Sequence, residues 1–214
     1  MSGPLGELEP ADHGSVANWV FETLYAFDRP EVGSIIPAVF PAYSCLLHSE
    51  FGDANQVQGA PRLEDVRMLT ETLRDATSTP GHCWFCIWNG WGWLHVSAGA
   101  IAPVGPGRPG WREPLVEVEQ FAASAPLVGD QYRQYHLFSG PVHAVVDSSM
   151  QAVPYQAPSL WWPDDRAWIV ASEIDLSWTY VGGAPEVIDR VIAAWRFDGW
   201  RVGPDDPIRW DELG

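Results

Sequence analysis

Thirteen tryptophans among 214 residues are the feature that most constrains how this chain folds. Each buried tryptophan or phenylalanine removes about 150–250 Å² from water, so a chain this rich in large rings needs a sizeable apolar core. Hydrophobic residues make up 46% of the sequence and charged residues only 19%, which excludes a wholly disordered chain. A chain of this length favours one large domain over two small ones.

The charge is strongly one-sided. There are 28 acidic residues and 12 basic ones, for a net charge of −16, and every basic residue is an arginine. The absence of lysine excludes a Walker-type phosphate loop, Schiff-base catalysis and a protein-kinase active site. A net charge of −16 repels the nucleic-acid backbone and anionic membrane surfaces, so we expect neither as a partner.

Residues 1–13 are polar, acidic and proline-containing, and we expect a disordered acidic leader rather than a signal peptide. No stretch of the chain approaches the roughly 18–20 apolar residues of a transmembrane helix. The three cysteines, an odd number, do not indicate a secreted disulfide framework. We therefore expect a cytoplasmic protein.

Apolar periodicity predicts the secondary structure. We expect helices over Val16–Phe27, Arg62–Ala76 and Ala184–Trp195, with a short helix or turn over Val142–Val146. We expect strands over Gly33–Pro37, Tyr43–His48, Cys83–Trp88, Tyr132–Ser139, Ala167–Asp175, Trp178–Gly182 and Trp200–Val202. After Cys83–Trp88, Asn89-Gly90 favours a tight turn from which Trp91, Trp93 and Leu94 return.

These elements do not alternate as regular βαβ units. That order favours an α+β fold with a largely antiparallel mixed sheet and about three helices over a doubly wound fold. We expect a single domain over residues 14–214, with a loop rich in glycine and proline near 98–114.

The segment Ser159–Gly183 reads SLWWPDDRAWIVASEIDLSWTYVGG. It resembles a stretch found in a family of uncharacterised, acidic, Trp-rich proteins from actinobacterial-type genomes of high GC content. The resemblance extends more weakly to 32–48 and 83–92. It implies one domain and carries no known function.

Glu173, Asp175 and Tyr180 are the candidate catalytic residues. On a strand, carboxylates two positions apart point to the same face, and they repel each other unless a cation or hydrogen-bond donors lie between them. Tyr180, on the returning strand, is positioned to face them. The pattern is typical of a general acid/base pair or a divalent-cation site. The alternative is a solvent-facing strand end whose charge is satisfied by Arg166 or another arginine.

Gly182 and Gly183 precede the helix expected from Ala184, and glycines that open a helix expose backbone N–H groups to an anion. They are therefore candidate anion-binding residues. The alternative is an ordinary strand-to-helix turn, because Glu186 already supplies negative charge to that helix terminus.

Cys83 and Cys86, together with Cys45 and His48, have the composition of a tetrahedral zinc site. Both pairs lie in apolar runs that predict strands, where positions i and i+3 face opposite sides of the sheet. We therefore predict buried structural cysteines, no metal and no cofactor.

Five tryptophans are candidates for ligand contact: Trp88, Trp91, Trp93, Trp161 and Trp162. Three of them flank a predicted turn and two are consecutive, so they cannot all face one core. We expect some to be exposed or to line a cleft, which suits recognition of a protein, a sugar or an apolar ligand. The alternative is a second small core.

Two functions fit these observations. One is a non-catalytic acidic binding protein, with an aromatic surface for a basic protein or a small apolar ligand. The other is a small-molecule hydrolase or isomerase that uses the paired carboxylates in a Trp-lined cleft. No hydrolase signature such as G-x-S-x-G occurs, which favours the binding protein. A deep pocket with the carboxylates at its floor would favour the enzyme, and a flat acidic and aromatic face would favour the binding protein.

Overall fold

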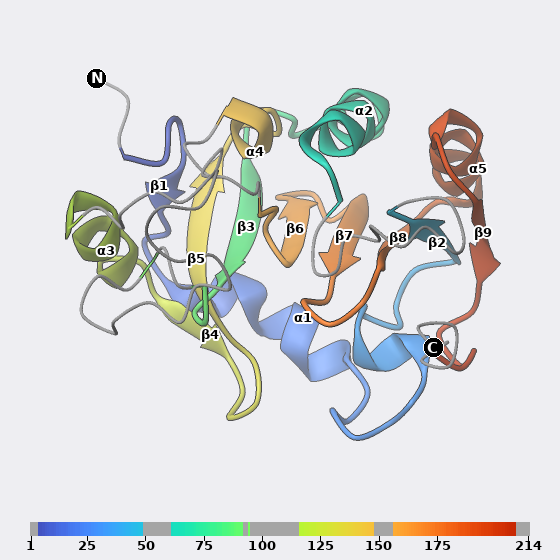
Figure 1. Ribbon diagram of the computed structural model, residues 1–214, viewed down its shortest axis with the longest axis horizontal. Coiled ribbons are helices and arrows are strands. Elements are labelled where there is room, and N and C mark those ends of the chain that lie inside the picture. The colour runs from blue at the N-terminus through green and yellow to red at the C-terminus, as the bar shows by residue number, and fades with distance from the viewer. Residues whose placement is uncertain (1–3, 49–60, 92–93, 95–115, 148–155, 209–214) are drawn as a thin grey trace, which may run out of the picture.

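A nine-stranded sheet forms the centre of the protein (Figure 1), and all of its pairings between described strands are antiparallel. The computed structural model describes residues 4–48, 61–91, 94, 116–147 and 156–208. The strands are β1 (Glu9–Pro10), β2 (Ala42–Leu47), β3 (Cys83–Trp88), β4 (Leu127–Gly129), β5 (Gln134–Gly140), β6 (Leu160–Pro163), β7 (Trp168–Ser172), β8 (Trp178–Gly183) and β9 (Gly199–Val202). Their order is β1-β5-β3-β6-β7-β8-β2-β9, and β4 also pairs with β5.

Helices cover both faces of this sheet. The described α-helices are α1 (Asn18–Thr23), α2 (Leu63–Arg74), α3 (Val116–Ala123), α4 (Ala144–Asp147) and α5 (Pro185–Ala194). Two 3₁₀ helices, η1 (Gly14–Ala17) and η2 (Val32–Ser34), add short turns. Figure 1 shows α2, α4 and α5 above the sheet and α1 below it. The α+β single domain is confirmed, although five described α-helices exceed the expected three or so.

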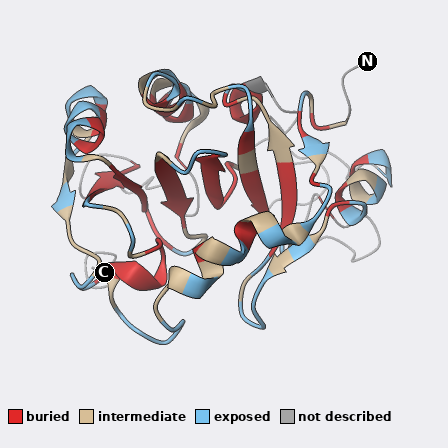
Figure 2. Cartoon of the chain, turned by 180° about the vertical axis from the view of Figure 1, so that it is seen from behind, coloured by how far each residue is buried: buried red, intermediate tan, exposed pale blue. Residues whose placement is uncertain are grey.

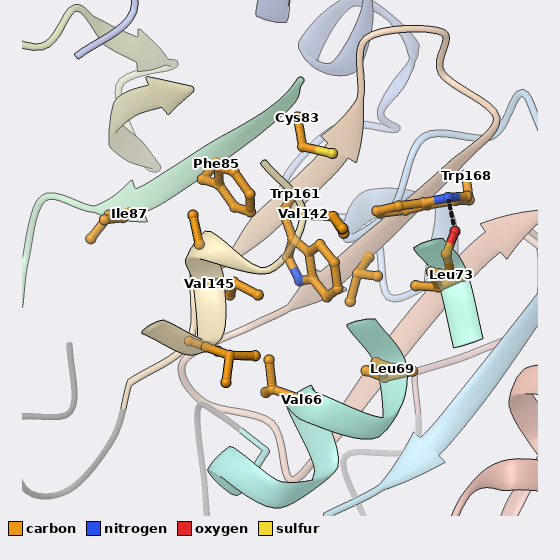
Figure 3. Close-up of a cluster of buried hydrophobic side chains, with 14 of the residues drawn as sticks. Val66, Leu69, Leu73, Cys83, Phe85, Ile87, Val142, Val145, Trp161 and Trp168 are labelled. Carbon is orange, nitrogen blue, oxygen red and sulfur yellow. Dashed lines mark hydrogen bonds between the residues drawn. The ribbon is translucent and has the colours of Figure 1, made fainter. Parts of the chain in front are cut away.

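The two covered faces create two apolar cores. One core lies under α2, α4 and α5 and contains Phe85, Trp161 and Trp168 (Figure 3), with the Trp168 indole donating to the carbonyl of Leu73 at 3.0 Å. The other lies below the sheet, between it and α1 and η2, and contains Trp162. Neighbouring residues of one strand therefore enter different cores, and the central strands are buried on both sides (Figure 2).

Most predicted elements are confirmed to within a few residues. The 3.6-residue periodicity of α2 and α5 places their apolar faces on the sheet. The apolar runs of β2, β3, β5, β8 and β9 form strands near the predicted positions. The predicted loop near 98–114 lies outside the described residues.

Two local predictions are wrong. Gly33–Pro37 is not a strand; η2 occupies part of it, and its apolar side chains fill the core below the sheet. The tight turn at Asn89-Gly90 forms, with the Trp91 N–H donating to the Trp88 carbonyl at 3.3 Å. The return is wrong for Trp91 and Leu94, which are not in a strand beside β3, because β5 and β6 pair with its two edges. Strands distant in sequence thus pair with β3 where Trp91 and Leu94 were expected.

The described part of the amino-terminal segment is ordered, which corrects the expectation of a disordered leader. Leu5 and Leu8 are only 1% and 0% exposed and belong to the core beneath α2 and α4. β1 pairs with β5, with Glu9 opposite Ser139. The few apolar residues of a polar segment are enough to anchor it when the edge of a sheet is available.

Candidate functional site

The structure does not place Glu173 and Asp175 together on a strand face. β7 ends at Ser172, so both carboxylates lie in the turn between β7 and β8. The Glu173 carboxylate accepts a hydrogen bond from the Ile174 N–H at 2.9 Å, whereas Asp175 is exposed. Glu173 and Asp175 therefore do not share a strand face.

Glu173 forms an ion pair with Arg133, from the turn between β4 and β5. Arg133 Nε lies 3.0 Å from Glu173 Oε2, and the two side chains are 15% and 13% exposed. The Nε–H does not point at that oxygen in hydrogen-bonding geometry, but Arg133 Nη1 donates to the Ser34 carbonyl at 2.7 Å. Burial, and then the nearby Glu173 carboxylate, raise the pKa of the Tyr135 hydroxyl. Through its ion pair with Arg133, Glu173 therefore links the turn between β7 and β8 to the turn between β4 and β5.

Tyr180 lies on the lower face of β8, in a pocket of about 330 Å³ that is also lined by Trp178 and Trp200. Its hydroxyl accepts a hydrogen bond from the Trp178 indole N–H at 2.8 Å. Neither Glu173 nor Asp175 is among the residues that line this pocket. The paired carboxylates are thus not at its floor.

The candidate tryptophans occupy different places. Trp161 and Trp162 are each 1% exposed and belong to opposite cores, because helices cover both faces of the sheet. Trp88 and Trp91 are half-buried and pack edge to face, with ring centroids 5.3 Å apart. Trp93 lies outside the described residues. The five do not form one described surface.

Gly182 and Gly183 do not form a helix-opening loop, since both lie within β8, paired with β2 and β7. A Cβ at Gly182 would stand 2.9 Å from the Phe40 ring, so this glycine lets the ring pack directly on the sheet. Close packing explains Gly182, whereas a Cβ at Gly183 would meet only ordinary contacts, the nearest at 3.5 Å. Since both residues are paired within β8, the anion-binding interpretation loses its geometric basis.

The cysteines are buried thiols. Cys83 lies in the upper core, and Cys86 and Cys45 in the lower one. Burial raises the pKa of the Cys83 thiol to about 12. Burial also raises the pKa of the Cys86 thiol. His48 is buried beside Thr179, with Nε2 and Oγ1 2.9 Å apart. Within the described ranges, no three His, Cys, Asp or Glu side chains are grouped to hold a metal ion.

An exposed aromatic pair, missed from the sequence, lies where two loops meet below the sheet. Phe27 and Tyr132 are 46% and 62% exposed, and their rings stack with centroids 4.9 Å apart and planes 10° apart. Arg133 lies over the Phe27 ring at 4.6 Å. Asp130 Oδ1 accepts the N–H groups of Tyr132 and Arg133 at 2.7 and 2.9 Å, which fixes the hairpin tip.

Carboxylates lie in and next to these two loops. The Tyr25 hydroxyl donates to Asp205 at 2.9 Å, and Arg29 pairs with Glu31 at 3.1 Å. We call this region the loop surface; it comprises Tyr25, Phe27, Asp28, Arg29, Glu31, Asp130, Tyr132, Arg133 and Asp205. With four carboxylates and two arginines, its net charge is negative. Gly129-Asp130 is a turn signal that places Tyr132 at a tip, but no sequence pattern pairs Tyr132 with Phe27.

Comparison with protein-family models, curated proteins and solved structures finds no match for this chain. Among the helices in the described parts of the chain, none is both long and apolar enough to cross a membrane.

Proposed function

We propose that this protein is a non-catalytic acidic binding protein whose loop surface engages a basic protein partner. The observation that carries the proposal is the Phe27–Tyr132 stack, two exposed rings held by loops whose backbone is tied down. Large exposed rings at a surface are the usual anchors of protein interfaces, since they bury much area at low entropic cost.

The surrounding charge supports a basic partner. Asp28, Asp130 and Asp205 are exposed in the loop surface, and the whole chain carries −16. Such a field accelerates the approach of a cationic protein and repels acidic ones. The tied loops also support the proposal, because a pre-organised surface loses little entropy on binding.

The carboxylate-based hydrolase or isomerase has less support. The Glu173 carboxylate is engaged in an ion pair with Arg133, and Asp175 is exposed on the turn. Tyr180 is buried in a separate pocket with Trp178. General acid/base chemistry needs its groups within about 2.6–3.2 Å of one reacting atom, and this arrangement supplies no such point.

The test compares the wild-type chain with the double variant Phe27→Ala/Tyr132→Ala. Partners captured from native lysate are identified by mass spectrometry, and the affinity of each purified partner is then measured. We expect a partner with a basic surface whose affinity falls at least about 100-fold in the double variant, as for removal of anchor residues. The matched control is Val116→Ala/Leu127→Ala, which trims exposed side chains elsewhere.

Salt provides a second readout. We expect association to slow markedly as ionic strength rises, because the Debye length shrinks from about 10 Å at 0.1 M to about 3 Å at 1 M. A captured partner that binds the Phe27→Ala/Tyr132→Ala variant as tightly as wild type would refute the assignment of the loop surface. Salt-independent kinetics would refute the steering role of the charge.

A further inference from the structure

Arg166 has an unusual backbone conformation. It ends the turn between β6 and β7, where its N–H donates to the Pro163 carbonyl at 2.9 Å. Its φ is 55°, and in the described parts of the chain no other residue except glycine has a positive φ. Glycine or asparagine adopts this left-handed conformation at lower cost. A strained residue of this kind points to a functional reason for the arginine side chain.

The Arg166 guanidinium lies 5.1 Å over the Trp19 ring and forms no ion pair with a described carboxylate. The two acids that precede it are engaged elsewhere. Asp164 accepts the Trp84 indole N–H at 3.0 Å, and Asp165 accepts the Ser78 hydroxyl and N–H, each at 2.7 Å. A cation thus stands over an aromatic ring with its neighbouring anions directed to other donors.

Arg166 also lines a pocket of about 500 Å³. Its walls are mainly apolar and come from α1, the loop before β2, the turn between β6 and β7 and the residue before α5; they comprise Trp19, Thr23, Val39, Phe40, Pro41, Ala167 and Ala184. Val39 is 52% exposed although it lies on this wall. The Trp19 indole N–H is buried and has no acceptor among the described residues. The size lies within the range of about 300–1,000 Å³ for small-molecule sites.

We propose that this pocket binds a small-molecule carboxylate with an aromatic or aliphatic body. The body packs against Trp19, Val39 and Phe40, and the carboxylate pairs with Arg166, whose planar fork matches its two oxygens. The net charge of −16 does not exclude such a ligand, because the pair forms in direct contact, well inside the Debye length of about 10 Å. A cationic ligand would be repelled by the Arg166 guanidinium.

Three probes with one body and different charges test the proposal: 3-phenylpropionate, 3-phenylpropanol and 3-phenylpropylamine. Binding is followed through the indole N–H signal of Trp19 in proton–nitrogen correlation spectra, assigned with Trp19→Phe. We expect the carboxylate to bind about tenfold more tightly than the alcohol, as one charge-assisted pair provides. The amine should bind most weakly.

Arg166→Gln removes the charge at an equally strained backbone, and we expect the preference for the carboxylate to vanish. Arg67→Gln is the matched control, since it changes the net charge equally from an exposed position on α2, and binding should be unchanged. If Arg166→Gln does not fold, Arg166→Gly relieves the positive φ and takes its place. The proposal is overturned if the alcohol or amine binds as tightly as the carboxylate. An equal loss in Arg67→Gln, or no shift of the Trp19 signal at the solubility limit of the probes, also overturns it.

Discussion

Replacing Glu173 with glutamine removes one charge of an ion pair whose side chains are only 13% and 15% exposed. Exposed ion pairs contribute about 0.2–1 kcal/mol, and breaking a fully buried pair costs about 3–5 kcal/mol. Glutamine keeps an acceptor for the Ile174 N–H but leaves the Arg133 guanidinium beside a neutral amide. We therefore expect the free energy of unfolding to fall by about 1–3 kcal/mol, the usual cost of an unsatisfied buried polar group.

Urea unfolding followed by tryptophan fluorescence measures this loss, provided that the m-value is unchanged. Asp175→Asn is the matched control, two positions along the same turn but exposed, and should change stability by less than about 0.5 kcal/mol. The double variant Arg133→Met/Glu173→Gln should lose less than the sum of its single variants. A loss in Glu173→Gln no greater than in Asp175→Asn would show that the ion pair does not hold the loops together.

Three further predictions follow from burial and hydrogen bonding. Leu8→Ala should lower the free energy of unfolding by about 2–5 kcal/mol in the same assay, because Leu8 is fully buried. A loss under about 0.5 kcal/mol would instead support a disordered amino-terminal segment. Burial acts to raise the pKa of Asp165, but hydrogen bonds from Ser78 and other donors hold it below its usual range. The stability advantage of wild type over Asp165→Asn should therefore be present above about pH 4 and disappear as the pH falls through the lowered pKa, and a pH-independent difference would contradict this. Burial and raised pKa values should keep Cys83 and Cys86 unreactive toward a disulfide reagent at pH 8 until the protein unfolds, and rapid modification of the folded protein would oppose that placement.

Local patterns in the sequence were sufficient for most of the regular elements. The periodicity of α2 and the apolar run of β3 predict these elements near their observed positions, because both signals depend on residues close in the chain. The antiparallel α+β class follows from the order of such elements. The opposite orientation of Cys83 and Cys86 follows as well, since strand geometry alone determines it.

The candidate site could not be derived in the same way. The position of Glu173 depends on where β7 ends, and a difference of one residue moves it from a strand face into a turn. Its partner, Arg133, comes from a distant hairpin, and the Phe27–Tyr132 stack also joins two distant loops. No periodicity within either segment contains information about the other.

The amino-acid sequence by itself determined which residues are apolar, where most of the helices and strands form, and that the chain is strongly acidic. Only the tertiary structure decided what covers each apolar face. Trp161 and Trp162 are both buried because helices lie on both sides of the sheet. Leu5 and Leu8 are buried because their segment pairs with a sheet edge and packs beneath two helices. The physical reason is that burial depends on contacts between segments far apart in the chain, whereas a sequence pattern reports only which side of its own element avoids water.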